Sequence, residues 1–496
     1  MRRIERYMRH PHRTQEAIRR QLIQATKHTE WGRKHGFRYV KTAEQFAAAM
    51  PVNDYDALKP YIARMMRGEK DVLWSGAVRW YSKSSGTTSD KSKFIPISNQ
   101  NLKQNHKRGG WDTVTLMYHQ RPDALQFGGK SLLMGGSMQP YEPYPKSIVG
   151  DVSAFLMHHM PSVTKPFVTP DFETALHPDF AEKIDRMADI ISRERDLVSL
   201  GGVPTWIVVL FRKIMERTGV ENLLELWPNL QSYIHGGVSF QPYEQQFREV
   251  YLPSDNITYQ EVYNASEGFF AAQSELTTKD MLLFLDNGVY YEFIPSGAWH
   301  QENPNTLQLH EVRPGENYAL VISTNGGLWR YTPGDTITFT STNPYKIRIT
   351  GRTKHFINAF GEEVMVENTD RAVARTCRVT GAVVSEYTVA PIYFGDGNKG
   401  GHQWLVEFET PPADIRKFSL LLDENLQRIN SDYEAKRFND MALLPLTLRP
   451  LPPGTLLNWL RSKGKFGSQA KVPRLANHRQ HVEEILAFVK KDLHPL

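Results

Sequence analysis

The feature that most constrains the fold is a change in hydrophobic pattern near residue 232. Before it, apolar residues recur at helical spacing; after it they alternate in short runs typical of strands. Helices followed by a succession of short strands predict a layered α/β fold with an added, mostly-β part. We expect helices over 14–25, 54–66, 99–118, 179–200 and 206–217, and strands over 232–235, 258–262, 281–284, 289–294, 317–323, 336–340 and 346–349.

The remaining segments complete this picture. The stretch 121–165 is rich in Pro, Gly, Met and Tyr, and we expect it to be irregular. Residues 343–345 mark a candidate domain boundary, and beyond it come mixed elements. At about 150 residues per domain, 496 residues make roughly three domain-sized units or two larger ones. We expect strands over 72–74, 78–81, 94–97, 379–389 and 404–408, and helices over 416–429 and 481–493.

The net charge of +6 is unevenly distributed. Residues 1–38 hold 11 Lys/Arg against 3 Asp/Glu, 39–345 hold 27 against 34, and 346–496 hold 22 against 17. Glu5 and Glu16 argue against a transit peptide, which is poor in acidic residues, and no apolar stretch of a secretory signal follows. Ile18, Leu22 and Ile23 fall at helical spacing. We therefore expect a packed amphipathic helix, with a targeting segment or a nucleic-acid arm as alternatives.

Composition excludes several classes of protein. A single cysteine, Cys377, excludes a disulfide framework and a cysteine-based zinc site and is typical of a reducing compartment, so we expect a cytoplasmic protein. No apolar run approaches the 18 residues of a membrane span. No zinc-finger, helix-turn-helix or RNP signature is present. We expect no membrane and no nucleic-acid partner.

Two motifs are misleading. The segment 395–400 satisfies G-x-G-x-x-G, but the following residues alternate as in a strand, whereas a dinucleotide loop must open a helix. We interpret it as a hairpin turn. The pair His158–His159 lacks a third metal ligand nearby, and adjacent side chains point apart. Neither a G-x-S-x-G elbow nor a G-x-x-x-x-G-K-[ST] loop occurs.

A loop rich in hydroxyl groups is more informative. Six consecutive small residues, Ser84–Ser89, lie between a predicted strand and the cations Lys91 and Lys93. Small side chains let backbone N–H groups and hydroxyls surround an anion, and the lysines add charge against phosphate. A loop of this composition alone is more often a solvated turn.

Two further segments favour the phosphate interpretation. Residues 262–269 end a predicted strand with Glu267 in a turn of small residues, where a carboxylate can bind Mg²⁺ beside phosphates. Residues 330–335 place Asp335 in a turn, where it can accept hydrogen bonds from ribose hydroxyls. Gly351–Lys354 follows about 16 residues later and opens the basic tail.

The order of these four segments resembles that of the adenylate-forming superfamily. The spacing S-S-G-T-T-x-x-x-x-K over 84–93 is similar to the Gretchen Hagen 3 family of acyl-acid amido synthetases, and the variants look closer to its bacterial branch than to the plant enzymes. Residues 29–37, 51–61 and 469–474 extend the resemblance over nearly the whole chain. Asp90 departs from the pattern, because the family often has glycine there.

The resemblance implies an adenylate-forming α/β fold. A large N-terminal domain, 1–350, with sheets, flanking helices and a barrel-like β part would bind ATP and the acyl substrate. A small mobile α+β domain, 351–496, would carry a closing lysine. The resemblance assigns the ATP phosphates to Ser84, Ser85, Gly86, Thr87, Thr88 and Lys93. Gly236 and Gly237 would lie against adenine, and Asp335 and Arg352 would bind the ribose. Glu267, beside Ser266, would bind Mg²⁺, and Lys471, with Lys465 as the competing candidate, would reach the α-phosphate.

The implied activity is ATP-dependent amide formation. A carboxylic acid would be activated as an acyl-adenylate with release of pyrophosphate, and an amine, an amino acid by resemblance, would displace AMP. The alternatives are an acyl-CoA ligase and a non-catalytic nucleotide-binding relative. Aromatic and Met side chains of 134–160 and 240–243 could line an acid pocket, and Arg108 or Lys130 could face a substrate carboxylate. We expect a monomer.

Overall fold

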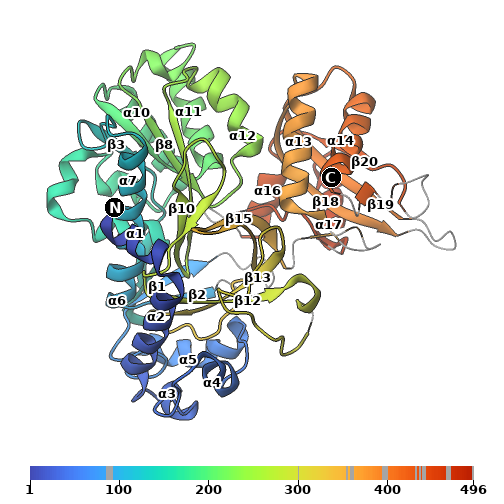
Figure 1. The fold of residues 1–496 in the computed structure, drawn as a ribbon. Coiled ribbons are helices and arrows are strands. Elements are labelled where there is room, and N and C mark those ends of the chain that lie inside the picture. The colour runs from blue at the N-terminus through green and yellow to red at the C-terminus, as the bar shows by residue number, and fades with distance from the viewer. Residues whose placement is uncertain are drawn as a thin grey trace. The chain divides into compact units, whose positions relative to one another are not determined.

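The computed structural model describes residues 1–84, 93–299, 301–353, 356–357, 362, 364–393, 400–430, 433–434, 437, 443–464, 471–476 and 478–493. The chain forms two compact units (Figure 1). The larger comprises Met1–Val238 and Gln246–Arg348, and the smaller comprises Ser239–Gln245 and Ile349–Leu496. The division falls inside one strand, after Arg348.

The basic N-terminal segment is packed structure. It forms α1 (Arg2–Arg9) and α2 (Pro11–Thr26), which bury Ile4, Tyr7 and Leu22. Gln15 accepts a hydrogen bond from the Tyr291 amide of β12 (Val289–Pro295) at 2.9 Å. Its Nε2 donates to the carbonyls of Leu285 and Val289 at 2.8 and 2.9 Å. The predicted amphipathic helix is confirmed, although α2 begins at Pro11 and a second helix precedes it.

The next segment is helical, as expected around residue 60. It contains α3 (Glu30–Lys34), α4 (Ala43–Ala49) and α5 (Tyr55–Met66), and Asp54 caps α5 by accepting from the Ala57 amide at 3.0 Å. The strand predicted over 72–74 is wrong: this segment is bent, and the carbonyls of Asp71 and Val72 accept from the amides that open α3.

A small sheet follows, with strand order β2-β1-β5-β4 among the described residues. The prediction of an irregular stretch over 121–165 is wrong, because three strands and a helix lie there. Local composition rich in Pro and Gly did not reveal that two of these strands pair with segments distant in sequence, residues 130–133 with 197–201 and residues 148–150 with 80–82. The strands of the small sheet are β1 (Trp80–Ser84), β2 (Lys93–Ile97), β4 (Met138–Tyr141) and β5 (Tyr144–Gly150). The stretch also contains β3 (Lys130–Leu133), which belongs to the large sheet, and α8 (Val152–His158).

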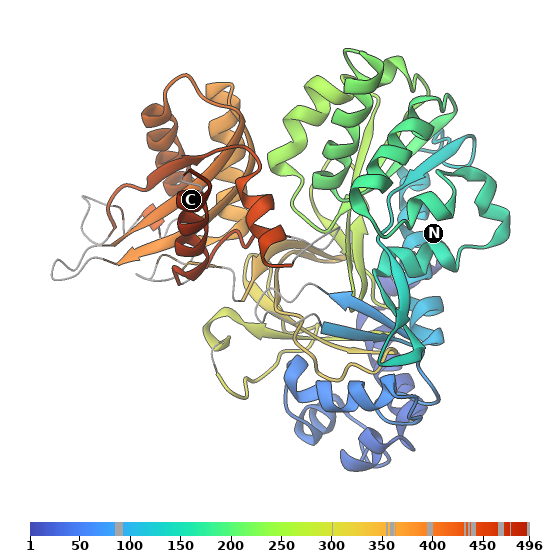
Figure 2. The same cartoon turned by 180° about the vertical axis from the view of Figure 1, so that it is seen from behind.

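The large sheet has, among the described residues, the order β12-β13-β14-β15-β11-β10-β9-β8-β7-β3-β6. One half is parallel: β6 (Val168–Thr169), β3, β7 (Leu197–Gly202), β8 (Ser232–Gly236) and β9 (Thr258–Ala265). Helices α7 (Lys107–Gln120), α10 (Phe180–Ser192) and α11 (Pro204–Thr218) lie beside these strands (Figure 1 and Figure 2). The helix predicted to reach residue 200 ends at Ser192, since a short buried apolar run has no period that separates strand from helix.

The other half of the large sheet is antiparallel. The alternating runs predicted its strands from residue 281 onward, whereas the strand over 268–273 was not predicted. The segment 343–345, predicted as a candidate boundary, contains the turn between two neighbouring strands and lies shortly before the division after Arg348. The strands are β10 (Gly268–Gln273), β11 (Met281–Leu283), β12, β13 (Asn317–Thr324), β14 (Asp335–Thr342) and β15 (Tyr345–Arg352). Short helical segments connect the elements: α6 (Asn99–Asn101), η1 (Leu102–His106), η2 (Ser162–Phe167), α9 (Phe172–Ala175), η3 (Leu223–Glu225), α12 (Gln241–Gln246), η4 (Phe247–Tyr251) and η5 (Ser296–Ala298).

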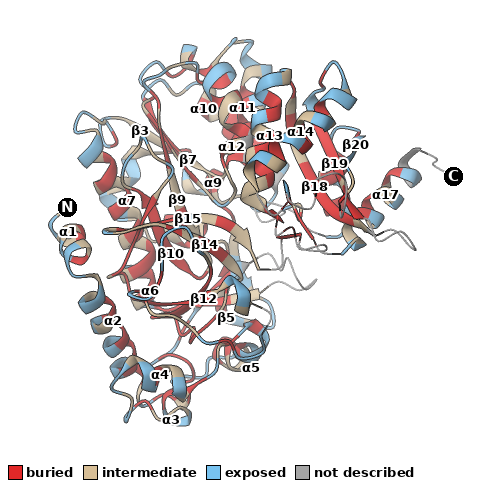
Figure 3. Cartoon of the chain, turned by 45° about the vertical axis from the view of Figure 1, so that its right-hand side comes forward, coloured by how far each residue is buried: buried red, intermediate tan, exposed pale blue. Residues whose placement is uncertain are grey.

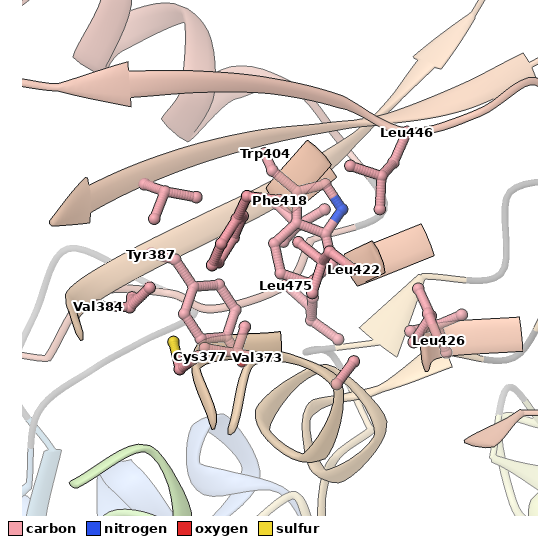
Figure 4. Packing of buried hydrophobic residues seen from close by; sticks show 14 of the residues in the cluster. Val373, Cys377, Val384, Tyr387, Trp404, Phe418, Leu422, Leu426, Leu446 and Leu475 are labelled. Atoms are coloured by element: carbon pink, nitrogen blue, oxygen red, sulfur yellow. The ribbon is translucent and has the colours of Figure 1, made fainter. Parts of the chain in front are cut away.

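In the part of the smaller unit that the structure describes, the main sheet has the strand order β18-β19-β20 and lies between two helix layers, and a second sheet pairs β16 with β17. Side chains alternate across it: Trp404 and Val406 of β19 face one core with α13 and α14, whereas Leu405 faces a second core with α16 and α17 (Figure 4). Figure 3 shows β18 and β19 largely buried. The elements are β16 (Phe356–Ile357), β17 (Val364–Met365), α13 (Val366–Thr380), β18 (Val383–Tyr393), β19 (Gly400–Thr410), α14 (Ile415–Ile429), β20 (Thr447–Leu451), α16 (Thr455–Ser462) and α17 (Gln480–Leu493).

The predicted fold class is confirmed: the chain is mixed α/β, with large sheets and a small α+β unit. The strand expected after the G-x-G-x-x-G segment is β19, and it pairs antiparallel with β18, Gly400 opposite Tyr393. Because a strand and not a helix follows, the segment does not match a dinucleotide loop. Residues 394–399 themselves lie outside the described residues.

Candidate active site

The carboxyl ends of the parallel strands are lined by small residues. Gly135 and Gly136 follow β3, Gly201 and Gly202 end β7, and Gly236 and Gly237 follow one another at the end of β8. A Cβ on Gly236 would lie 2.4 Å from the carbonyl oxygen of Val262 on β9, and Gly237 has φ +82°. Open α/β sheets bind ligands outside the carboxyl ends of their strands. The predicted small-residue turn is therefore present at the edge where a nucleotide can approach the backbone.

Glu267 lies in the turn beside this edge. Ser266 and Glu267 form a two-residue turn between β9 and β10, where Gly268 pairs with Ala265. The amide of Phe269 donates to Asn105 Oδ1 at 2.7 Å, and Asn105 Nδ2 donates back to the Phe269 carbonyl at 3.3 Å. The buried Asn105 side chain thus fixes the backbone just after the turn that carries Glu267.

The hydroxyl-rich loop begins next to the same turn. Ser82 of β1 donates to Ser266 Oγ at 3.0 Å, which joins the small sheet to the large one. Strands β1 and β2 are antiparallel, and Ser84 pairs with Lys93 at the base of the loop. Lys93 Nζ lies 5.8 Å from the centre of the Tyr55 ring. The structure therefore places both ends of the loop, whereas the predicted residues Ser85, Gly86, Thr87 and Thr88 lie outside the described residues.

Asp335 is joined to the strand that leads to Glu267. It begins β14, and its Oδ2 accepts from the Tyr263 hydroxyl at 2.6 Å. A hydrogen bond to an ionised carboxylate is short and strong, so Tyr263 orients Asp335. The structure thus links Asp335, through Tyr263, to the strand that leads into the turn of Ser266 and Glu267.

A buried ion pair holds the turn before Asp335. The Arg330 guanidinium lies 3.0 Å from Glu292 Oε1, and the two side chains are 5% and 4% exposed. Arg330 also donates to the carbonyls of Ala47 and Met50 at 2.8 and 2.6 Å and to Thr306 Oγ1 at 2.8 Å. Sequence reasoning gave Arg330 no role, because its partners come from three distant segments.

Buried titratable groups surround the strand ends. Burial lowers the pKa of His235, on β8, to about 3, and lowers the pKa of His106 to about 4, so both are neutral at pH 7. Burial likewise lowers the pKa of Lys183 to about 8, while its Nζ donates to the carbonyls of Gly135 and Gly136 at 3.0 and 3.3 Å. Lys183 therefore fixes the segment of Gly135 and Gly136 after β3. The sequence did not predict this contact, because a lysine on a predicted helix is usually exposed to solvent.

Other predicted residues belong to the smaller unit or have different partners. Arg352 ends β15, Lys471 is exposed just before a buried segment, and Lys465 lies outside the described residues. Lys130 Nζ pairs with Glu194 at 2.6 Å, and Arg108 Nη1 donates to the Asp286 carbonyl at 3.0 Å. Both cations considered for a substrate carboxylate thus have protein partners.

No preformed metal cage is found in the part of the chain that the structure describes, since no three His, Cys, Asp or Glu side chains gather there. Mg²⁺ is commonly held by one or two carboxylates together with substrate phosphates and waters. Glu267, 8% exposed at the end of the parallel strands, fits this kind of site. Over the described residues, no helix has the length and apolar character needed to span a membrane.

Comparison with family models gives matches in three successive parts of the chain. Residues 1–187 match the GH3 family N-terminal domain, 282–352 the GH3 family central domain and 367–480 the GH3 family C-terminal domain. Together these ranges cover most of the chain in the order of the family.

Similar curated proteins come from plants. Indole-3-acetic acid-amido synthetase GH3.8 of Oryza sativa subsp. indica is 23% identical, over 95% of this chain and 89% of the relative. The 4-substituted benzoates-glutamate ligase GH3.12 of Arabidopsis thaliana is 20% identical, over 87% of each chain.

Solved structures show the same fold. The chain superposes on AtGH3.15 acyl acid amido synthetase in complex with 2,4-DB with a TM-score of 0.76 and 17% identity, covering 96% of this chain and 93% of the other. It superposes on 2-hydroxyisobutyryl-CoA ligase, in complex with R3-HIB-AMP, with a TM-score of 0.61 and 12% identity. The match covers 96% of this chain and 91% of the ligase.

Proposed function

The chain belongs to the GH3 family, and from this premise we propose that it is an ATP-dependent acyl-acid amido synthetase. It activates a carboxylic acid as an acyl-adenylate, releasing pyrophosphate, and transfers the acyl group to the amine of an amino acid, releasing AMP. The observation that carries the proposal is the match to all three GH3 domain models in order along the chain. The resemblance of the motifs to the adenylate-forming superfamily agrees with it.

The chemistry explains why such residues are needed. A carboxylate acylates poorly because oxide is a poor leaving group, whereas AMP leaves readily. The acid oxygen attacks the α-phosphorus and the bond to pyrophosphate breaks; the amine nitrogen then attacks the acyl carbon and the bond to AMP breaks. Both steps spread negative charge over phosphate oxygens, so preorganised cations and N–H donors lower the barriers.

We assign the nucleotide to the carboxyl edge of the parallel strands. Gly236 and Gly237 leave room for adenine, and Asp335 and Arg352 bind the ribose. The Tyr263 hydroxyl, 2.6 Å from Asp335 Oδ2, orients this carboxylate to accept hydrogen bonds from the ribose hydroxyls. Glu267 holds Mg²⁺, which neutralises phosphate charge when bound. Its neighbour Ser266 is fixed by Ser82 at 3.0 Å. The phosphates are assigned to Ser84, Ser85, Gly86, Thr87, Thr88 and Lys93, and the lysine that meets the α-phosphate is Lys471.

The domain assignment is part of this proposal. Residues 1–350 bind ATP and the acid, and 351–496 supply the closing lysine. We propose that the protein works in the cytoplasm, where ATP is available and where its one cysteine, buried Cys377, can stay reduced. The plant relatives act on indole-3-acetic acid and on 4-substituted benzoates by their names, and we propose a small aromatic or similar carboxylic acid for this chain.

A substrate screen tests the proposal. Pyrophosphate release is measured with ATP, MgCl₂ and a panel of acids including indole-3-acetate and substituted benzoates. Each of the twenty amino acids, CoA or hydroxylamine serves as acceptor, and products are identified by mass spectrometry. An amide and AMP in equal amounts support the synthetase. A thioester with CoA and no amide would indicate an acyl-CoA ligase, and no adenylate with any acid would indicate a non-catalytic nucleotide-binding relative.

A further inference from the structure

A short segment of the smaller unit, 472–476, lies along strand β18 and is called the strap below. The Val389 amide donates to the Arg474 carbonyl at 2.8 Å, and the Ala476 amide donates to the Val389 carbonyl at 3.3 Å. The Thr388 hydroxyl donates to the Pro473 carbonyl at 2.6 Å. Leu475 is fully buried in the core between the sheet and α13 and α14 (Figure 4). The strap is thus joined to β18 by backbone bonds and a core side chain.

The side chain of Arg474 adds an electrostatic anchor. Its Nη1 lies 2.9 Å from Asp370 Oδ1 on α13, and its Nη2 lies 3.0 Å from Glu386 Oε1 on β18. The guanidinium also lies 4.4 Å from the centre of the Tyr387 ring. Arg474 therefore ties the strap to a helix and to a strand at the same time.

The anchor needs arginine and not merely a positive charge. Asp370 is 1% exposed and accepts from the Tyr387 hydroxyl at 2.5 Å, so it cannot turn toward water. A planar guanidinium can contact two carboxylates and lie over a ring, whereas a lysine ammonium is a point charge on a flexible stem. Burial alone would lower the pKa of Arg474, but the negative charges of Glu386 and Asp370 outweigh it and raise this pKa. The guanidinium therefore stays charged.

Lys471 is close to this anchor along the chain. It precedes the strap and is exposed. Three residues of extended chain span at most about 11 Å, so the position of Arg474 limits where the backbone of Lys471 can lie. A shift of the strap would move the lysine by a similar amount.

We propose that Arg474 is a positioning residue for Lys471: by tying the strap to Asp370 and Glu386, it fixes the place from which Lys471 acts. The inference rests on the proposed function, in which Lys471 meets the α-phosphate. Misplacement of a catalytic group by about 1 Å can cost about 100-fold in rate. Loss of the anchor therefore lowers the turnover number for adenylation and leaves ATP binding nearly unchanged.

Four variants test this: Arg474→Gln, Arg474→Lys, Lys471→Ala and the double variant Arg474→Gln/Lys471→Ala. Adenylation is followed by pyrophosphate release with ATP, MgCl₂, hydroxylamine and the acid that gives the highest rate in the screen above. We expect kcat of Arg474→Gln to fall about 10- to 100-fold with the KM for ATP within about threefold of wild type, and Arg474→Lys to restore only part of the rate. The double variant should be no slower than Lys471→Ala alone, since Arg474 acts through the lysine.

Arg437→Gln is the matched control. Arg437 pairs with Asp423 at 2.9 Å in the same unit, and the two side chains are 8% and 6% exposed. It also donates to the Leu443 carbonyl at 2.9 Å, and neither Asp423 nor Leu443 belongs to the strap. Its loss should lower stability while kcat stays near wild type. An equal fall of kcat in Arg437→Gln would show that any weakening of the unit slows the reaction, and the proposal would be wrong.

Hydrogen–deuterium exchange separates this inference from the proposed function. Peptides covering 471–476 and 388–390 should exchange faster in Arg474→Gln than in wild type, whatever the activity. Unchanged exchange would overturn the anchoring itself. A wild-type rate in Arg474→Gln, together with an inactive Lys471→Ala, would overturn the positioning role and leave the proposed function intact. An inactive wild-type enzyme would overturn the proposed function and, with it, the role of Arg474.

Discussion

Replacing Arg330 by Met should strongly destabilise the larger unit. The side chain is almost fully buried and ties Glu292 of β12 to the carbonyls of Ala47 and Met50 and to Thr306. Removing one member of a buried ion pair leaves an uncompensated charge and typically costs about 3–5 kcal/mol. Each buried carbonyl left without a donor adds about 1–3 kcal/mol where water cannot enter. We expect Arg330→Met to lower the free energy of unfolding by at least about 3 kcal/mol.

Urea unfolding measures this loss. Circular dichroism and tryptophan fluorescence serve as independent probes, because a chain of two units need not unfold in one transition. The double variant Arg330→Met/Glu292→Gln removes the unpaired charge and should recover part of the loss. Arg193→Met is the control: Arg193 pairs with Asp189 on the surface of α10, the side chains are 77% and 46% exposed, and its removal should leave the midpoint nearly unchanged.

Two results would refute this reasoning. The first is a loss below about 1 kcal/mol for Arg330→Met, the size of an ordinary surface change, which would mean that water or a local shift satisfies Glu292 and the two carbonyls. The second is an additional loss when Glu292→Gln is combined with Arg330→Met, since the buried carboxylate could not then be the source of the cost.

Three further predictions concern residues at the carboxyl ends of the strands. Tyr263→Phe removes the hydroxyl that orients Asp335 and should raise the KM for ATP about fivefold with little change in kcat; steady-state kinetics check it, and an unchanged KM would count against the ribose assignment. Gly236→Ala places a Cβ 2.4 Å from a carbonyl oxygen of β9 and should lower the thermal midpoint, whereas Gly110→Ala, where nothing lies within 4 Å, should not. Burial lowers the pKa of Lys183 from 10.5 to about 8, so between these pH values the unfolded chain binds more protons than the native one. The stability of the wild type should therefore rise from pH 8 to 10.5 relative to Lys183→Met, and parallel pH profiles of the two proteins would contradict the shift.

Elements with a clear period were predictable from the sequence. The helix capped by Asp54 and the alternating strands β12, β13 and β14 lie where the pattern indicated, because burial of one face imposes a period on the residues. The strand β7 was not predictable in this way. Its first four residues are all buried, whichever face of the sheet they point to, so its apolar run has no alternation and resembles the end of the preceding helix.

The candidate site likewise has features that could be predicted from the sequence and contacts that could not. Residue types and their spacing along the chain were enough to predict the order of the motifs, the small residues at the end of β8 and the carboxylates Glu267 and Asp335. The hydrogen bonds of Tyr263 with Asp335, across 72 residues, and of Ser82 with Ser266, across 184, are visible only in the folded chain. Such bonds depend on the order of strands in the sheets, and strand order is set by packing between distant segments and has no local period in the sequence.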